Sequence, residues 1–245
     1  MDFESFLNEL RASPAYGDQT AYTRVLEPRE ARFADTARPL AQSCRAYLEA
    51  AGIDRLYRHQ AEAIDAVREG RDVLVVTGAA SGKSLCYQLP LLEMLQMRSD
   101  ATALLLHPTK ALSQDQFQTL SAALAAARLA GSLAGVFDGD TAAAVRRKLR
   151  DEGRVVLTNP DMLHAALLPQ HTRWAAFLQR LAFVVIDELH TYSGLFGSNA
   201  ANLFRRIERV PLRQPPADGL VLRNCGQSRG GRAEADRAAA GGDRR

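Results

Sequence analysis

Five short apolar runs, separated by stretches with helical spacing, constrain the fold of this 245-residue chain more than any other feature. The runs lie at 72–77, 101–107, 135–137, 155–158 and 181–186. Their leucine-rich and β-branched composition is typical of short strands that are buried on both faces. Strands that alternate with helices in this way form a parallel sheet covered by helices on both sides. We therefore expect an α/β fold built on a single sheet.

Composition divides the chain into three parts. Residues 1–50 contain short helical stretches punctuated by three prolines, and we expect them to form an N-terminal extension. Residues 51–210 hold the apolar runs and form the expected domain. Residues 211–245 contain six Gly and seven Arg but no Ile, Phe, Tyr or Trp, which is too few large apolar side chains for a core. We expect this tail to be disordered.

A loop of small residues follows the first apolar run and precedes a stretch with helical spacing at 83–97. In this position small residues let backbone amides approach phosphate oxygens, and the helix start adds a favourable partial charge. Lys83 would reach the β- and γ-phosphates of a nucleotide, and Ser84 would bind Mg²⁺. Thr77 stands where the usual phosphate-binding pattern has its first Gly, so an ordinary glycine turn is the alternative. The expected ATP-binding residues of this phosphate loop are Thr77, Gly78, Ala79, Ala80, Ser81, Gly82, Lys83 and Ser84.

Two adjacent carboxylates end the fifth apolar run. Asp187 and Glu188, the acid pair, directly follow the strand expected at 181–186. Ligands of open α/β sheets bind just beyond the carboxyl ends of the strands, so the acid pair and the phosphate loop should share one edge. Asp187 would hold Mg²⁺ and Glu188 would polarise the attacking water. The expected catalytic residues are therefore Lys83, Asp187 and Glu188, and a solvated acidic turn is the alternative.

The net charge of +3 is confined to one end of the chain. Residues 211–245 carry seven Arg against four acidic residues, whereas residues 1–210 balance 24 basic with 24 acidic side chains. Any binding of nucleic acid by the expected domain must therefore come from local groups rather than from bulk charge.

The cysteines and the hydropathy pattern exclude some classes of site. Cys44, Cys86 and Cys225 show neither metal-ligand spacing nor a disulfide pattern, so we expect no zinc, and we expect Cys86 to be a buried thiol. No apolar run reaches 18 residues and no leader pattern is found. We expect a cytoplasmic protein without membrane contact.

Several short motifs resemble, in the same order, those of the DEAD/DEAH-box helicases of superfamily two. The acid pair with Leu189 and His190 resembles motif II, and residues 58–60 resemble the Q motif. Residues 108–112 resemble motif Ia, residues 138–141 the next nucleic-acid motif, and residues 158–163 the motif that usually reads Thr-Pro-Gly-Arg. A closer likeness is to the MrfA-like (YprA-like) branch of DNA repair helicases. It rests on residues 29–60, 80–87, 159–164 and 190–198.

The resemblance implies one RecA-like domain that binds ATP and Mg²⁺ and takes part in translocation on single-stranded DNA. It implies that Gln60 reads the adenine edge and that His190 couples the ATP site to a second RecA-like domain. The residues implied to contact the DNA backbone are Pro108, Thr109, Lys110, Gly139, Asp140, Thr158, Asn159 and Pro160. Simple capping of helix starts is the alternative for Thr109 and Asn159.

Two alternatives stay open for the activity of the chain. Motif III of the family, Ser-Ala-Thr, is absent from residues 205–245, so we expect the chain to end before a second RecA-like domain. It would then be the ATP-binding domain of a DNA helicase or, alternatively, a non-enzymatic fragment that binds nucleotide and nucleic acid. We expect the tail to be read out of frame after Val210, with a natural basic segment that binds nucleic acid as the alternative.

The remaining candidate side chains have structural interpretations. Trp174 and Phe177 are expected in the core, and Arg205, Arg206 and Arg209 on a solvated helix face, with DNA contact as the alternative. Histidines without ligand spacing are expected to be structural or surface residues, namely His59, His107, His164 and His171.

Overall fold

The computed structural model describes residues 3–15, 30–77, 81–209 and 220–225. The chain divides into two compact units, residues 1–31 and residues 32–245. The first unit contains helix α1 (Phe3–Ala12), which has no buried residue. The second unit contains the sheet and the other described helices.

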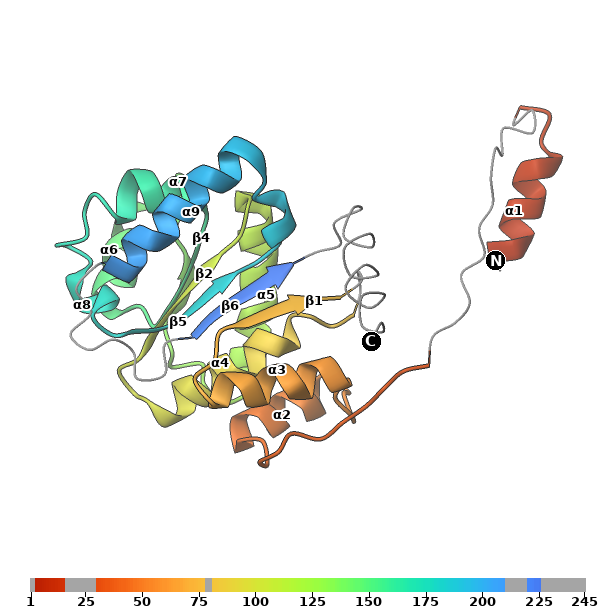
Figure 1. Cartoon of the computed structure of the whole chain (residues 1–245), viewed down its shortest axis with the longest axis horizontal. Helices are drawn as coiled ribbons and strands as arrows, with labels where there is room; N and C mark the ends of the chain where they lie inside the picture. Colours follow the sequence, from red (N-terminus) through yellow and green to blue (C-terminus); the bar gives the residue numbers. More distant parts are fainter. Residues whose placement is uncertain (1–2, 16–29, 78–80, 210–219, 226–245) are drawn as a thin grey trace, which may run out of the picture. The chain divides into compact units, whose positions relative to one another are not determined.

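Within the described residues, six parallel strands form one sheet at the centre of the second unit (Figure 1). In chain order they are β1 (Val73–Val76), β2 (Thr102–Leu106), β3 (Ala134–Val136), β4 (Val155–Thr158), β5 (Leu181–Ile186) and β6 (Leu220–Cys225). Their order in space is β1-β6-β5-β2-β4-β3. The α/β fold expected from the sequence is confirmed, and the five expected strands end within one residue of their expected bounds.

Helices connect the strands. Those of the second unit are α2 (Gln42–Ala50), α3 (Arg58–Arg68), α4 (Leu85–Met97), α5 (Lys110–Ala126), α6 (Ala143–Glu152), α7 (Pro160–Met162), α8 (Ala175–Leu178) and α9 (Gly194–Arg209). A π-helical turn at Leu163–Leu167 continues α7, and a 3-10 turn at Leu189–Thr191 follows β5. The sequence pattern predicts a helix at 161–167 but does not predict α8 or the 3-10 turn.

Strand β6 corrects the expectation that all of residues 211–245 are disordered. Leu220–Cys225 pairs in parallel with β1 on one side and with β5 on the other. It begins with three consecutive apolar residues, Leu220 to Leu222, and such a run suits a short central strand. A composition averaged over the whole tail hides a strand of this length. The rest of the tail lies outside the described residues.

The sheet separates two apolar cores. Side chains of a strand alternate between its faces, so Leu105 of β2 packs in one core while Leu104 and Leu106 pack in the other. The first core also contains apolar side chains of α2 to α5, and the second those of α6 to α9. Figure 1 shows α2 and α3 on one side of the sheet and α9 on the opposite side. Trp174 and Phe177 are buried in the second core, as expected.

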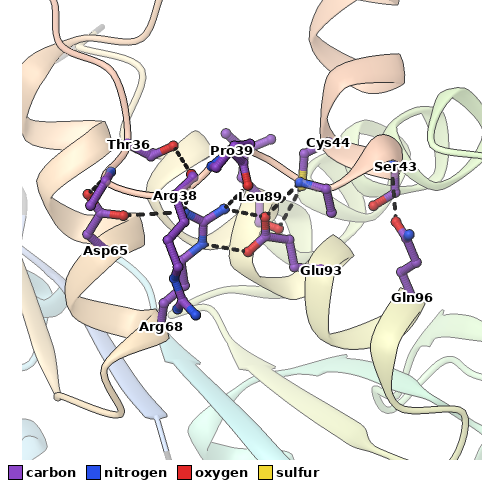
Figure 2. A network of polar contacts seen from close by, with 12 residues as sticks. Thr36, Arg38, Pro39, Ser43, Cys44, Asp65, Arg68, Leu89, Glu93 and Gln96 are labelled. Carbon is purple, nitrogen blue, oxygen red and sulfur yellow. Dashed lines mark hydrogen bonds and ion pairs between the residues drawn. The ribbon is translucent and has the colours of Figure 1, made fainter.

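The buried guanidinium of Arg68 joins α3 to α4 and to the segment that precedes α2 (Figure 2). Arg68 pairs with Glu93 of α4 at 2.6 Å and with Asp65 of α3 at 3.3 Å. It also donates to the carbonyl oxygen of Arg38 at 2.7 Å. Since two carboxylates and a carbonyl surround it, the charge is buried but well compensated.

Further contacts hold the start of α2 against α4. The backbone N–H of Ala41 donates to Glu93 Oε1 at 3.0 Å, and that of Ser43 donates to Gln96 Oε1 at 3.1 Å. The buried thiol of Cys44 donates to a carbonyl oxygen of α4 at 3.2 Å. Figure 2 shows the contacts of Ser43 and Cys44 on the side of Arg68 where Glu93 lies, with Asp65 on the other side. Residues 36–44 are therefore an integral part of the α3–α4 face of the domain.

We expect Arg68→Met to lower the free energy of unfolding by about 3 kcal/mol, because Glu93 would stay buried without its counter-ion. Chemical denaturation followed by circular dichroism measures the loss. The matched control is Arg71→Met, which removes an ion pair with Glu69 whose side chains are 62% and 60% exposed. The control should cost less than about 1 kcal/mol. Equal losses in the two variants would contradict the role given to Arg68.

Candidate functional site

Apart from Gln60, which lies in the first turn of α3, the expected site residues follow strands at the carboxyl edge of the sheet. The phosphate loop follows β1 and the acid pair follows β5, with β6 between these two strands. The other motifs follow β2, β4 and β3, which are neighbours in the remainder of the sheet. Strand order thus divides the edge into a phosphate half, after β1 and β5, and an outer half, after β2, β4 and β3.

Thr77 and Ser81 precede and follow the undescribed residues 78–80 of the phosphate loop, and their hydroxyl oxygens are 2.6 Å apart. Lys83 donates from Nζ to the carbonyl oxygen of Thr77 at 3.4 Å. Ser84 directly precedes α4, which begins at Leu85. Gly78, Ala79 and Ala80 lie outside the described residues, so their phosphate contacts stay predictions.

Gln60 links the start of α3 to the phosphate loop. Its Oε1 accepts from the backbone N–H of Tyr57 at 2.8 Å and so caps α3. Its Nε2 donates to the carbonyl oxygen of Gly82 at 2.8 Å. Gly82 has a left-handed φ of 70°, and a Cβ at this position would lie 2.6 Å from Gln60 Nε2. Glycine alone allows both this backbone conformation and this contact. The adenine contact expected of Gln60 stays a prediction.

Aromatic rings that the sequence does not single out lie beside the capping contact of Gln60. Tyr57 stacks on Phe33 with ring centres 5.3 Å apart, and on His59 at 5.8 Å. The guanidinium of Arg55 lies 4.5 Å from the centre of the Phe33 ring. Phe33 and Tyr57 are 39% and 38% exposed. Exposed flat rings suit the stacking of a base, and the position of Tyr57 just before residues 58–60 is the signal that could have predicted them.

The acid pair has a constrained geometry. Asp187 is 5% exposed, and its Oδ1 accepts from the backbone N–H of Glu188 at 2.8 Å. Glu188 has a left-handed φ of 51°, a conformation that costs a non-glycine residue roughly 1–2 kcal/mol. Its Oε2 lies 3.0 Å from Nδ1 of His190. His190 thus contacts the expected catalytic carboxylate, while its coupling to a second domain stays a prediction.

His107 lies where the two halves of the edge meet. Its Nε2 is 3.7 Å from Asp187 Oδ2. Within the described structure, the imidazole is fully buried and neither ring nitrogen has a hydrogen-bond partner. Burial lowers the pKa of His107 to about 4, so the ring is neutral at pH 7. The interpretation of His107 as structural agrees with its burial but misses its contact with Asp187.

The loops that follow β2 and β3 in the outer half form an exposed cluster. Lys110 Nζ pairs with Asp140 Oδ2 at 3.0 Å. A Cβ at Gly139 would lie 3.1 Å from the same Nζ. Thr109 Oγ1 accepts from the backbone N–H of Leu112 at 3.2 Å, which confirms that Thr109 caps α5. The structure therefore brings these expected nucleic-acid residues together.

Asp138 holds the turn that presents Asp140. Its Oδ1 accepts from the backbone N–H of Asp140 and from Thr141 Oγ1, each at 2.9 Å. Its Oδ2 accepts from Gln114 Nε2 at 3.2 Å. Burial alone would raise the pKa of Asp138, but these hydrogen bonds hold it below its usual value. Asp138 is therefore ionised at pH 7 and keeps the turn closed.

The loop after β4 corrects one expected contact. The hydroxyl of Thr158 is fully buried and donates to the carbonyl oxygen of Phe137 at 2.7 Å. It therefore supports the loop from inside and does not face a ligand in this conformation. Asn159 Oδ1 accepts from the backbone N–H of Met162 at 2.9 Å, which confirms it as the cap of α7. Phosphate contact by Asn159 and Pro160 stays a prediction.

A groove with a volume of about 350 Å³ lies between α7 and α9, beside Pro160. His164, Phe196 and Arg206 contribute to its walls, and Arg206 Nη1 lies 3.4 Å from His164 Nδ1. Arg205 and Arg206 are exposed, as expected of a solvated helix face.

Two features are absent from the described part of the chain. No helix in it is long and apolar enough to cross a membrane, and no group of three or more His, Cys, Asp or Glu could hold a metal ion. Cys44 and Cys86 are both buried free thiols. Burial raises the pKa of Cys86 to about 12, so the expectation of a buried thiol is confirmed.

Known proteins resemble this chain over most of its length. The family described as DEAD/DEAH box helicase matches residues 57–222. The chain is 44% identical over 204 residues to the ATP-dependent helicase YprA of Bacillus subtilis, and 36% identical over 205 residues to the ATP-dependent helicase HRQ1 of Saccharomyces cerevisiae. Each alignment covers 83% of this chain but only 27% and 19% of the respective relative.

Solved structures give the same result. The crystal structure of the DUF1998 helicase MrfA bound to DNA and AMPPNP is similar with a TM-score of 0.79 and 37% identity. The similarity covers 93% of this chain and 31% of that one. The chain therefore spans less than a third of the length of these relatives.

We expect Gly82→Ala to weaken nucleotide binding by about tenfold, because an alanine at positive φ strains the phosphate loop and displaces Gln60. Titration with a fluorescent ATP analogue measures the affinity. Gly131→Ala is the matched control, since a Cβ there meets nothing within 4 Å. A Gly82→Ala variant with unchanged affinity would contradict the role of the Gln60–Gly82 contact.

Proposed function

Since this chain belongs to the DEAD/DEAH box helicase family, in its MrfA/YprA-like branch, we propose that it forms the ATP-binding domain of an ATP-dependent DNA helicase. ATP and Mg²⁺ would bind at the phosphate half of the edge, and single-stranded DNA at the outer half. The observation that carries the proposal is the strand order, which leaves one strand between the phosphate loop and the acid pair. The side chains of the phosphate loop and of the acid pair can therefore act on one nucleotide.

The residues of the phosphate half fit ATP and Mg²⁺. Gly82 lets Gln60 approach the phosphate loop closely and hold its backbone, and the start of α4 favours negative charge. Lys83 would bind the β- and γ-phosphates, while Ser84 and Asp187 would hold Mg²⁺. When bound, the ion would neutralise charge that develops on the phosphate oxygens. A site with few protein ligands suits Mg²⁺, which keeps several waters and phosphate oxygens in its shell.

Glu188 has the position expected of a general base. Its Oε2 would take the proton of the attacking water, and His190 Nδ1 at 3.0 Å would orient this oxygen. The left-handed backbone of Glu188 supports the assignment, because strained residues that persist are concentrated at functional sites. The MrfA-like relative with bound AMPPNP also supports a nucleotide in this half.

The outer half suits the backbone of a nucleic acid. Lys110 supplies an exposed positive charge, and the amides at the starts of α5 and α7 can bind phosphates without reading bases. Asp140 holds Lys110 at the surface and would release it to a phosphate. The relative MrfA is bound to DNA in its crystal structure, which supports DNA as the ligand. Preference for a single strand is part of the proposal.

The alternative function is a fragment that binds nucleotide without hydrolysing it. The likeness to ATP-dependent helicases argues against this alternative, and a measurement of ATP hydrolysis distinguishes the two. We expect the chain to hydrolyse ATP and expect single-stranded DNA to raise the rate. Glu188→Gln should keep nucleotide affinity but lower the rate by about 10²–10⁴-fold, because the base is lost. Lys83→Ala should lose nucleotide affinity itself.

Steady-state phosphate release, with and without single-stranded DNA, checks the rates, and a fluorescent ATP analogue checks the affinities. If the unmodified chain did not hydrolyse ATP, the proposal that it is an enzyme would be excluded. Wild-type affinity in Lys83→Ala would exclude the phosphate loop as the nucleotide site.

We expect Lys110→Ala to weaken binding of single-stranded DNA of any sequence and to reduce the slope of log K against log salt by about 0.7, the value for one lost phosphate contact. Fluorescence anisotropy at several salt concentrations measures this slope. Lys148→Ala on the exposed face of α6 is the control, because it removes the same charge away from the edge. Equal effects of the two substitutions would exclude a specific contact at Lys110.

A further inference from the structure

We propose that His107 is a positioning residue that orients the Asp187 carboxylate and couples the outer half of the edge to the phosphate half. The inference rests on the proposed function, because it assigns to Asp187 the binding of Mg²⁺ and to the outer half the binding of DNA. It deepens that function by naming the side chain through which one ligand influences the other.

The place of His107 in the fold is the first argument. β2 and β5 are the adjacent strands at which the outer half meets the phosphate half. The backbone N–H of His107 donates to the carbonyl oxygen of Thr158, at the end of β4, at 2.9 Å. The backbone N–H of Asp187 donates to the carbonyl oxygen of Leu106, at the end of β2, at 2.9 Å. His107 therefore belongs to the outer half by its backbone and contacts the phosphate half by its ring.

The second argument is that the His107 side chain destabilises the fold and makes no hydrogen bond to a described residue that would compensate for its burial. Its imidazole is fully buried, and within the described residues neither nitrogen makes a hydrogen bond. A buried polar group without a partner is destabilising, and an apolar side chain of similar volume would pack without that cost. Among the described residues the hydroxyl of Tyr192 is also buried without a hydrogen-bond partner, and its pKa is raised by burial first and by the charge of Asp187 second. Packing alone therefore does not explain a histidine at position 107.

The chemistry of the ring fits the role. A neutral imidazole carries one N–H, and Nε2 is the nitrogen that lies 3.7 Å from Asp187 Oδ2. A small closure would turn this approach into a hydrogen bond, and such contacts commonly tighten when the ligand binds. Asp187 Oδ1 is already held by the N–H of Glu188. With Oδ2 held by His107, the plane of the carboxylate would be set from both sides, as is usual for carboxylates that bind a metal.

The coupling follows from chain connectivity. Pro108 and Thr109 directly follow His107, and Thr109 caps α5. A phosphate bound at the start of α5 would shift this short segment and with it the imidazole. We therefore expect DNA to lower the Mg²⁺ concentration needed for nucleotide binding, and we expect this effect to depend on the donor at position 107.

Two substitutions test the inference. His107→Leu removes the hydrogen-bond donor but fills a similar volume with an apolar side chain, whereas His107→Gln keeps a donor close to the position of Nε2. A fluorescent non-hydrolysable ATP analogue is titrated in EDTA and at increasing Mg²⁺, with and without single-stranded DNA. His107→Leu should raise the half-saturating Mg²⁺ by about tenfold, leave affinity in EDTA unchanged and abolish the effect of DNA. His107→Gln should restore both properties to near wild-type values.

Thermal unfolding separates this role from a packing role. A positioning residue predicts that His107→Leu unfolds at the same temperature as the wild type or higher. A residue needed only for packing predicts a lower Tm for both variants with an unchanged Mg²⁺ requirement, which would overturn the inference. Failure of DNA to change the Mg²⁺ requirement of the wild type would overturn the coupling.

Lys83→Ala separates failure of this inference from failure of the proposed function. It should lose the nucleotide analogue both in EDTA and in Mg²⁺. Loss in Lys83→Ala together with an unchanged Mg²⁺ requirement in His107→Leu would leave the proposed function standing and exclude the role of His107. Undiminished binding by Lys83→Ala would exclude the proposed function itself.

Discussion

The buried pair of Arg68 and Glu93 is the interaction on which the geometry of the nucleotide site depends. It joins α3, whose first turn carries Gln60, to α4, which begins directly after the phosphate loop. With the two helices held in register, the amide of Gln60 can meet the carbonyl oxygen of Gly82 at 2.8 Å. The segment that precedes α2 closes over the pair and excludes water, which strengthens it. A contact far from any ligand therefore sets the shape of the loop that would hold the phosphates.

The local sequence pattern was enough to predict most of the strands and helices and many of the residues that lie at the candidate site. The strands β4 and β5 have the bounds predicted from their apolar runs, because fully buried strands leave a continuous hydrophobic signal. The acid pair and Lys83 could be assigned to one edge because parallel strands present their carboxyl ends together. The short motifs at Thr109 and Asn159 predicted helix starts, and both side chains are caps.

What could not be predicted depends on contacts between distant segments. His107 ends an apolar run, and nothing near it in the sequence indicates that its ring meets Asp187. Thr158 has the residue type of a phosphate ligand, but its hydroxyl is used by the carbonyl oxygen of Phe137 from another strand. Gln60 caps a helix and also contacts a glycine in the left-handed conformation. The sequence can suggest the cap and the glycine turn separately, but it does not show that the two meet. Tertiary packing, which local composition does not encode, decides these three cases.

Strand β6 also has a consequence for how the domain is made. It is the partner that joins β1 to β5, and Val73 pairs with Leu222, roughly 150 residues later in the chain. As the chain leaves the ribosome, β1 stays unpaired until its partner β6 emerges. Open strand edges are prone to pair with other chains. Completion of the phosphate half thus follows the synthesis of the other five described strands, and the strand that stays unpaired until then is the one that carries the nucleotide loop.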